Sequence, residues 1–129
     1  MIIAVDFDGT CVTHEYPLIG KDIGAVPALK SLVDNKNKLI LLTMRSDALL
    51  NAAVNWFKEN GIELWGIQDN PDQSRWTTSR KVYAQVYIDD AALGCPLKFD
   101  EAVCDRPFVD WGQAMRMLEE KGAIKIGEQ

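Results

Sequence analysis

Short apolar segments alternate along the chain with segments of helical periodicity, and turn-forming Gly, Pro, Asn and Asp residues separate them. This alternation is typical of β-α units arranged around a mostly parallel sheet. The first apolar segment, residues 2–5, is continuously hydrophobic, as expected for a central strand that is covered on both faces. Further strands are predicted at residues 39–42, 64–67, 86–88 and 107–109.

Apolar residues at three- and four-residue spacing predict helices between these strands. One helix is expected over about residues 26–35, where Pro27 suits the first turn. A second is expected over residues 47–60, with Ser46 as its N-cap and Gly61 as its stop. The remaining predicted helices are a short one at residues 76–83 and a last one between Asp110 and Gly122.

These elements predict one domain over residues 1–129, a three-layer, Rossmann-like α/β domain whose mostly parallel central sheet has about five strands. Three polar residues, Asp6, Thr43 and Asp89, each stand at the carboxyl end of a predicted strand. In open parallel α/β sheets, ligands bind at that edge. We therefore expect the functional site there.

Composition narrows the class of protein. With 47% hydrophobic and 26% charged residues, the chain can bury a core and remain soluble. The formal net charge of −5 makes non-specific binding to nucleic acid or to an anionic membrane unexpected. The N-terminal segment lacks a basic region and its apolar run stops at Asp6, so neither a signal peptide nor a membrane span is predicted. The spacing of Cys11, Cys95 and Cys104 indicates reduced thiols, and we expect a cytoplasmic protein.

Asp6 and Asp8 stand two residues apart where the first predicted strand ends, and Gly9 lets the chain turn sharply after them. The two carboxylates can then converge on one small site. Taken alone, such a pair is more often a solvated loop than a functional site. The pair therefore needs further motifs before it indicates a function.

Four motifs follow one another in a fixed order: DFDGT at 6–10, LILLT at 39–43, Lys81, and YIDD at 87–90. Together they resemble the motifs of the haloacid dehalogenase-like (HAD) hydrolase superfamily, and the chain is most similar to its small members that lack a cap domain. The match spans nearly the whole chain. The resemblance implies a magnesium-dependent phosphatase that hydrolyses a phosphate monoester through an aspartyl-phosphate intermediate.

The resemblance also implies the catalytic roles. Asp6 would attack phosphorus, and Asp8 would protonate the leaving oxygen and then activate water. Thr43 would donate a hydrogen bond to a phosphate oxygen, and Lys81 would neutralise charge there, with Arg80 as its adjacent competitor. Further substrate contacts are expected from Gly9, Thr10, Arg45 and Trp76. For Arg45 a solvated position, and for Trp76 a packing role, is the alternative.

Magnesium is expected because an anionic nucleophile must approach an anionic phosphate, and a divalent cation removes the repulsion. Asp6 and Asp89 offer hard oxygen ligands, and the resemblance adds the main-chain carbonyl of Asp8. Asp90 either ligates the ion, directly or through water, or holds Lys81. The single histidine, His14, is expected at the surface or in packing.

Two segments, residues 11–23 and 68–79, occupy the places where superfamily members usually carry a cap. Each is only about a dozen residues long, too short to fold as a domain. The site is therefore expected to be open to a small phosphorylated substrate or to an exposed phosphate on a larger molecule, or else to be covered by another subunit of a homo-oligomer. The alternatives to a phosphatase are a non-catalytic magnesium- or phosphate-binding HAD-like module and a phosphotransferase of the same superfamily.

Overall fold

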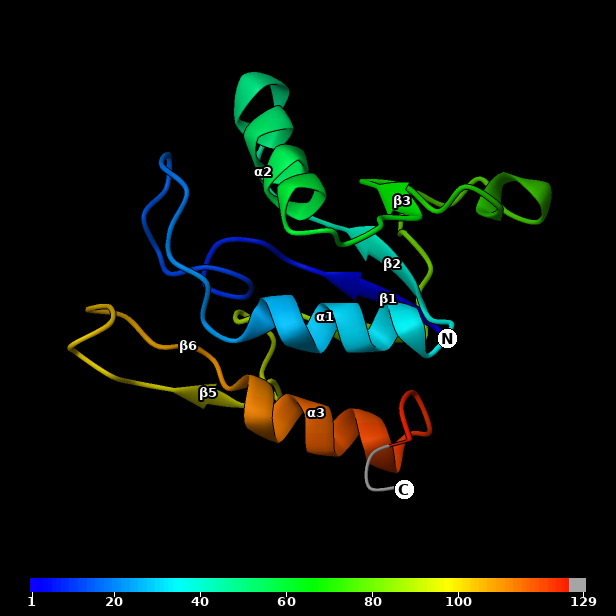
Figure 1. Cartoon of the computed structure of the whole chain (residues 1–129). Helices are drawn as coiled ribbons and strands as arrows, with labels where there is room; N and C mark the ends of the chain where they lie inside the picture. The colour runs from blue at the N-terminus through cyan, green and yellow to red at the C-terminus, as the bar shows by residue number, and fades with distance from the viewer. Residues whose placement is uncertain (126–129) are drawn as a thin grey trace.

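The computed structural model describes residues 1–125, and Figure 1 shows its arrangement. Within these residues, the central sheet has four parallel strands in the order β3-β2-β1-β4. The predicted α/β fold with a parallel sheet is therefore confirmed, although the strand predicted at 64–67 is shorter than expected. The four strands are β1 (Ile2–Val5), β2 (Lys38–Leu41), β3 (Gly66–Ile67) and β4 (Val86–Ile88).

The α-helices lie close to their predicted positions. The side chain of Asp110 accepts the main-chain N–H of Gln113 and so caps the last helix, as its position in the sequence suggested. Ser46 is the N-cap of the second helix, although its side chain makes no capping bond. None of the helices in the described part of the chain is long and apolar enough to cross a membrane. The three are α1 (Ala25–Asp34), α2 (Asp47–Glu59) and α3 (Trp111–Glu120).

The fifth predicted strand does not join the central sheet. Its residues form β6 (Phe108–Val109), which pairs antiparallel with β5 (Leu97–Lys98) in a separate two-stranded sheet. The main-chain N–H of Val109 donates to the carbonyl of Gly9, so this segment is held against the loop that follows β1. The expected sheet of about five strands is therefore corrected to four among the described residues, and β4 is an edge strand.

The short helix predicted at 76–83 is also wrong. The only helical turn in this region is the 3-10 helix η1 (Gln73–Arg75). The Gln73 amide donates to the carbonyls of Ser79 and Lys81 and accepts the N–H of Tyr83. These bonds satisfy main-chain groups that a helix would have paired internally, so the segment stays irregular.

The two faces of the central sheet are covered differently. On one face, all three α-helices contribute to a single buried cluster together with the strand residues Ile3, Val5, Leu39 and Leu41. Figure 1 shows α1 and α3 running side by side there. On the opposite face, Ala4 and Ile40 form a smaller cluster with Trp65, Val82 and Ala84. The expected third layer is thus made of irregular chain.

Right-handed crossover connections explain this division. The chain steps from β1 to β2 and then to β3 in one direction across the sheet, so α1 and α2 cover the same face. It then returns past β2 and β1 to reach β4, and a right-handed connection in that direction crosses the opposite face. The return segment, residues 68–85, contains η1 and otherwise irregular chain.

Candidate functional site

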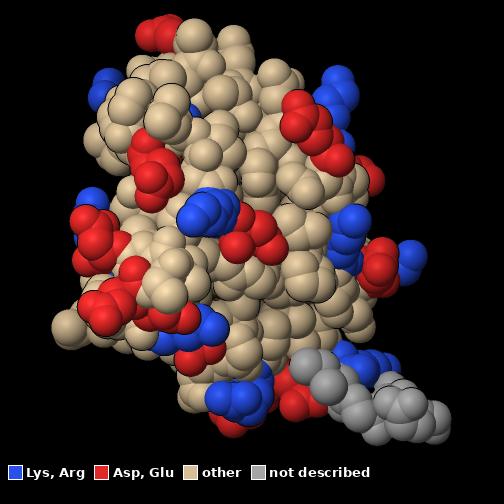
Figure 2. Space-filling view, turned by 60° about the vertical axis from the view of Figure 1, so that its left-hand side comes forward, with Lys and Arg blue, Asp and Glu red and all other residues tan. Residues whose placement is uncertain are grey.

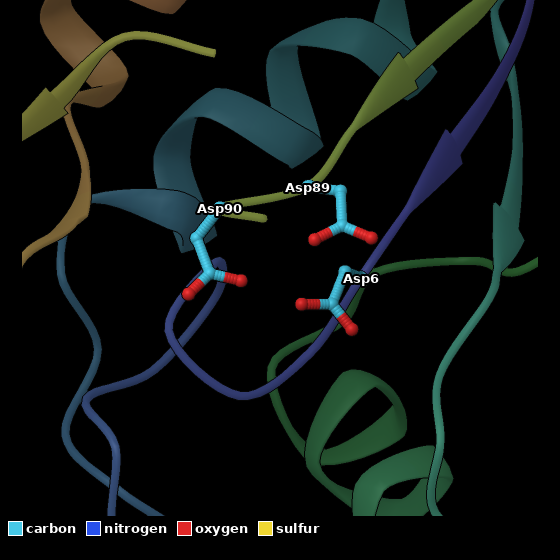
Figure 3. Close-up of side chains that lie close together, drawn as sticks. All are labelled: Asp6, Asp89 and Asp90. Carbon is cyan, nitrogen blue, oxygen red and sulfur yellow. The ribbon is translucent and has the colours of Figure 1, made fainter. Parts of the chain in front are cut away.

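Three carboxylates meet at the carboxyl end of the central sheet. Asp6 follows β1, and Asp89 and Asp90 follow the neighbouring strand β4. Each of these residues offers a ligand atom, and the ligand atoms lie within 4.8 Å of one another. The main-chain N–H of Asp6 donates to the carbonyl of Ile88 at 3.0 Å, which continues the strand pairing up to the site. Figure 3 shows the three carboxylates side by side where the loop after β1 meets the chain leaving β4.

The cluster favours a cation. Burial, together with the negative charge of Asp89, raises the pKa of Asp6 to about 7. Three acidic groups this close repel one another when ionised, and a bound divalent cation would remove that cost. The donor set consists of oxygen atoms alone, which suits a hard ion such as Mg²⁺. The residues present therefore fit the expected metal.

Thr10 links two members of the acidic cluster. Its hydroxyl lies 3.0 Å from Oδ2 of Asp6 and 3.4 Å from Oδ1 of Asp90, and it accepts the main-chain N–H of Asp90 at 3.1 Å. The carbonyl of Thr10 accepts the indole N–H of Trp111 at 2.7 Å. Thr10 is fully buried, and its hydroxyl is bonded to two of the acids, where the sequence suggested a substrate contact.

His14 joins the site, although the sequence placed it at the surface or in packing. Its Nε2 lies 3.1 Å from Oδ2 of Asp90. Gly9 makes room for this contact: its φ is +80°, and a Cβ there would collide with the His14 ring and lie 2.5 Å from Oδ2 of Asp90. No spacing in the sequence signals the contact, because it depends on how the loop after Gly9 returns toward the sheet.

Replacing Gly9 with alanine should therefore disturb both the loop and the His14–Asp90 contact. We expect Gly9→Ala to lower the free energy of unfolding by about 1–3 kcal/mol, because the positive φ and the steric overlap both oppose a Cβ. Urea unfolding of the two proteins measures this difference. Gly94→Ala is the matched control, since a Cβ at Gly94 meets nothing within 4 Å, and it should change stability by less than about 0.5 kcal/mol. Equal stabilities for both alanine variants would contradict the prediction.

The Asp8 side chain pairs with Arg45 and is not part of the acidic cluster. Nε of Arg45 donates to Oδ2 of Asp8 at 2.8 Å, and Nη2 donates to Oδ1 at 2.7 Å. These hydrogen bonds raise the pKa of Arg45, which is therefore always a cation. Only the main-chain oxygen of Asp8 is left for a metal, as the resemblance implies.

The Arg45 guanidinium is buried, whereas the sequence suggested either a substrate contact or a solvated position. Its remaining donors bond to the main-chain oxygens of Pro17, Leu18 and Leu49. The guanidinium carbon lies 5.0 Å from the centroid of the Phe7 ring and 5.2 Å from that of Tyr16. A guanidinium has five N–H groups, and all five are used here.

Thr43 stands at the same edge of the sheet, just past the end of β2. Its main chain is fixed by Gln68, whose amide accepts the Thr43 N–H at 2.8 Å and donates to the Thr43 carbonyl at 2.6 Å. The Thr43 hydroxyl accepts the N–H of Arg45 at 3.2 Å and keeps its own hydrogen as a donor. Thr43 thus offers a hydroxyl donor on a fixed main chain, at the same edge of the sheet as the acidic cluster. Nothing in the sequence indicated that Gln68 would hold the main chain of Thr43.

Lys81 lies apart from the cluster. Its Nζ is 5.7 Å from the centroid of the Tyr87 ring, and neither Lys81 nor Arg80 forms an ion pair within residues 1–125. Lys81 therefore lies beside Tyr87 of β4, and no ion pair joins it to Asp89 or Asp90 among the described residues.

Trp76 lies in the same region as Lys81. The Trp76 ring packs edge-on against Tyr83 at 5.5 Å between centroids and stays 63% exposed. Both rings border a hollow of about 310 Å³ that Lys81 and Tyr87 also line. Trp76 and Lys81, both expected to contact substrate, therefore line this hollow. Neither residue contributes a ligand atom to the acidic cluster.

Acidic and basic side chains are interspersed on the face shown in Figure 2. Among the described residues on that face there is no extended basic area of the kind that binds nucleic acid non-specifically.

No family model and no curated protein matches the sequence. Among solved structures, the chain is similar to a conserved protein coded by a locus of Bacteroides thetaiotaomicron. The two sequences are 38% identical, the match covers 94% of this chain and 91% of that chain, and the TM-score is 0.77. The likeness therefore extends to the fold over nearly the full length. The chain belongs to the same family as this conserved Bacteroides protein.

Proposed function

We propose that this protein is a magnesium-dependent phosphohydrolase of the HAD type, which hydrolyses a phosphate monoester through an aspartyl-phosphate on Asp6. One observation carries the proposal: the ligand atoms of Asp6, Asp89 and Asp90 lie within 4.8 Å of one another at the carboxyl end of parallel strands. The order of the four sequence motifs supports it, since it brings Asp6, Thr43 and Asp89 to one edge of the sheet.

The carboxylates of Asp6, Asp89 and Asp90 and the main-chain oxygen of Asp8 would hold Mg²⁺. When bound, the ion supplies positive charge that lets a phosphate approach the acids and that stabilises the phosphoryl oxygens. The Thr43 hydroxyl donates to one of these oxygens. Lys81 would neutralise charge on the phosphate, for which its side chain has to turn away from the Tyr87 ring.

The proposed reaction has two steps. First, a carboxylate oxygen of Asp6 forms a bond to phosphorus while the bond from phosphorus to the leaving oxygen breaks, and Asp8 gives that oxygen a proton. Second, Asp8 takes a proton from a water molecule, whose oxygen attacks phosphorus and releases inorganic phosphate from Asp6. The two proton transfers together leave Asp8 unchanged over one turnover. Dividing the displacement in this way replaces one difficult step with two easier ones.

The substrate is a small phosphorylated molecule or an exposed phosphate on a larger one. The segments 11–23 and 68–79, where a cap would be inserted, contain no domain: their described structure consists of isolated bridges, turns and η1. We assign the protein to the cytoplasm, because Cys11, Cys95 and Cys104 are all free thiols, which fits a reducing compartment.

Activity should depend on magnesium. With p-nitrophenyl phosphate as substrate, we expect hydrolysis to rise at least about tenfold when Mg²⁺ is added to EDTA-treated protein, because the acidic cluster repels phosphate without a cation. Mg²⁺ should also raise the melting temperature of the protein, since the ion binds only the folded site. Asp89→Asn should weaken both effects.

Equal hydrolysis with Mg²⁺ and with EDTA would exclude the proposed role of the acidic cluster. A rise in melting temperature without hydrolysis of any phosphate ester would favour the non-catalytic magnesium-binding module instead.

A further inference from the structure

We propose that Arg45 is a positioning residue for Asp8: it fixes the orientation of the Asp8 carboxylate and does not bind the phosphate of the substrate. The proposal deepens the proposed phosphohydrolase function and rests on it, because it assigns Asp8 a reaction in which orientation matters. It differs from the expectation that Arg45 would contact substrate.

The first argument is the geometry of the pair. Nε and Nη2 of Arg45 donate to different oxygens of Asp8, at 2.8 and 2.7 Å. Two parallel bonds between a guanidinium and a carboxylate fix the plane of the carboxylate as well as its position. A single bond, or a lysine ammonium, would leave the carboxylate free to turn. The Asp8 side chain is therefore held in one orientation.

The second argument is that Arg45 is itself held on every side. Pro17, Leu18 and Leu49 accept its other N–H groups at 3.3, 2.8 and 3.4 Å. Only 1% of its side chain is exposed, and no buried polar side-chain atom in the described chain lacks a partner. To reach a phosphate, the guanidinium would have to break several of these hydrogen bonds at once. This arrangement supports Asp8 and leaves no donor for a substrate.

The third argument concerns the loop from which two of the acceptors come. Pro17 and Leu18 lie in a loop that is closed by two hydrogen bonds between Thr13 and Lys21, each of 2.9 Å. Arg45 connects this loop to Asp8 through a single side chain. The loop therefore helps to hold Asp8 in place through Arg45.

The test compares Arg45→Lys with wild type, using p-nitrophenyl phosphate as substrate and inorganic phosphate as a competitive inhibitor. Lysine keeps the positive charge but cannot form the bidentate pair. We expect kcat to fall about 100-fold, because a misplaced catalytic group loses about that much. KM and the inhibition constant of phosphate should change less than about threefold, because Arg45 does not touch phosphate. Arg75→Lys is the matched control: Arg75 also pairs with an aspartate, Asp72, but its side chain is 78% exposed.

A double-mutant cycle tests whether Arg45 acts through Asp8. Once Asp8→Asn has removed the carboxylate, adding Arg45→Lys should lower kcat by less than about threefold more. Full additivity of the two losses would overturn the proposal. A rise in the phosphate inhibition constant as large as the loss in kcat/KM would overturn it too, and would make Arg45 a phosphate ligand.

Tyr16→Leu gives a second test in case Arg45→Lys does not fold. Tyr16 is 59% exposed, so its replacement should preserve the fold while removing the ring beside the guanidinium. We expect kcat to fall about two- to fivefold with unchanged phosphate inhibition, the effect of losing one partly exposed cation–π contact. An unchanged kcat would count against the proposal.

A wild type without magnesium-dependent hydrolysis would overturn the proposed function and this inference together, whereas an active wild type with additive losses would overturn only the inference.

Discussion

Asp6→Asn should abolish turnover while leaving the fold intact. An amide has nearly the same shape as a carboxylate but cannot attack phosphorus, and removing a nucleophile commonly costs about 10⁴-fold or more in kcat. The Thr10 hydroxyl keeps an oxygen partner in the new side-chain amide, so the hydrogen bond that links Thr10 to this position can persist. Steady-state hydrolysis of p-nitrophenyl phosphate with Mg²⁺ measures the loss.

The same variant should be more stable than wild type at alkaline pH without metal. The pKa of Asp6 is about 7 in the folded protein, because of burial and the charge of Asp89, against about 3.9 in an unfolded chain. The raised pKa means that stability is greatest below about pH 4 and is lost as pH rises through about 7. A neutral amide at this position avoids this loss of stability. In EDTA we therefore expect the free energy of unfolding of Asp6→Asn to exceed that of wild type by about 1–3 kcal/mol near pH 8. The difference between the two proteins should narrow toward pH 4.

Asp69→Asn provides the control, because Asp69 is exposed and lies outside the acidic cluster. It should retain wild-type turnover and show the wild-type dependence of stability on pH. If Asp6→Asn kept near-normal kcat, Asp6 would not be the nucleophile. If its stability in EDTA followed the wild-type pH curve, the burial of a charged Asp6 would not be costly.

The sequence predicted those parts of the fold that local patterns determine. Continuous apolar runs located β1, β2 and β4, and residues such as Asp110 and Gly61 located helix ends. Because the strands were expected to be parallel, the residues after them were expected at one edge. The structure brings Asp6 and Asp89 together there.

The parts that the sequence did not predict depend on contacts between distant segments. Residues 76–83 have a helical pattern, but the Gln73 side chain occupies their main-chain groups and keeps them irregular. The sequence around β6 predicts one more parallel strand. In the structure, the Val109 N–H donates to the Gly9 carbonyl, and β6 pairs antiparallel with β5. In both places tertiary contacts override the local pattern.

Arg45 is the clearest case of a site residue that the sequence placed differently. Its position two residues after Thr43 indicated that it was near the site, but an arginine in a loop is usually solvated. What turns it inward is the Asp8 carboxylate on one side and the carbonyls of Pro17 and Leu18 on the other. These partners come from 27 to 37 residues away along the chain, so no local pattern predicts them.

The second large effect is expected for Asp8→Asn, and it should depend on the leaving group. If Asp8 protonates the leaving oxygen, its removal should slow hydrolysis of an alkyl phosphate by about 10²–10⁴-fold. The first step with p-nitrophenyl phosphate should suffer less, because p-nitrophenolate leaves readily without a proton. The substitution also takes one acceptor from the buried Arg45, so we expect stability to fall by about 1–3 kcal/mol. Kinetics must therefore be measured well below the melting temperature of the variant.

The second step of the reaction gives Asp8→Asn a distinct signature. Water attack on the aspartyl-phosphate needs the same base whatever the first leaving group was, so with p-nitrophenyl phosphate the variant should form the intermediate faster than it hydrolyses it. Rapid-quench kinetics should show a burst of p-nitrophenolate, and intact-protein mass analysis should find one phosphoryl group on the chain. That group should be missing from the double variant Asp6→Asn/Asp8→Asn, which identifies Asp6 as its carrier. Equal losses on both substrates, with no phosphorylated protein, would instead indicate that water attacks the phosphate directly and that Asp8 has no part in two successive steps.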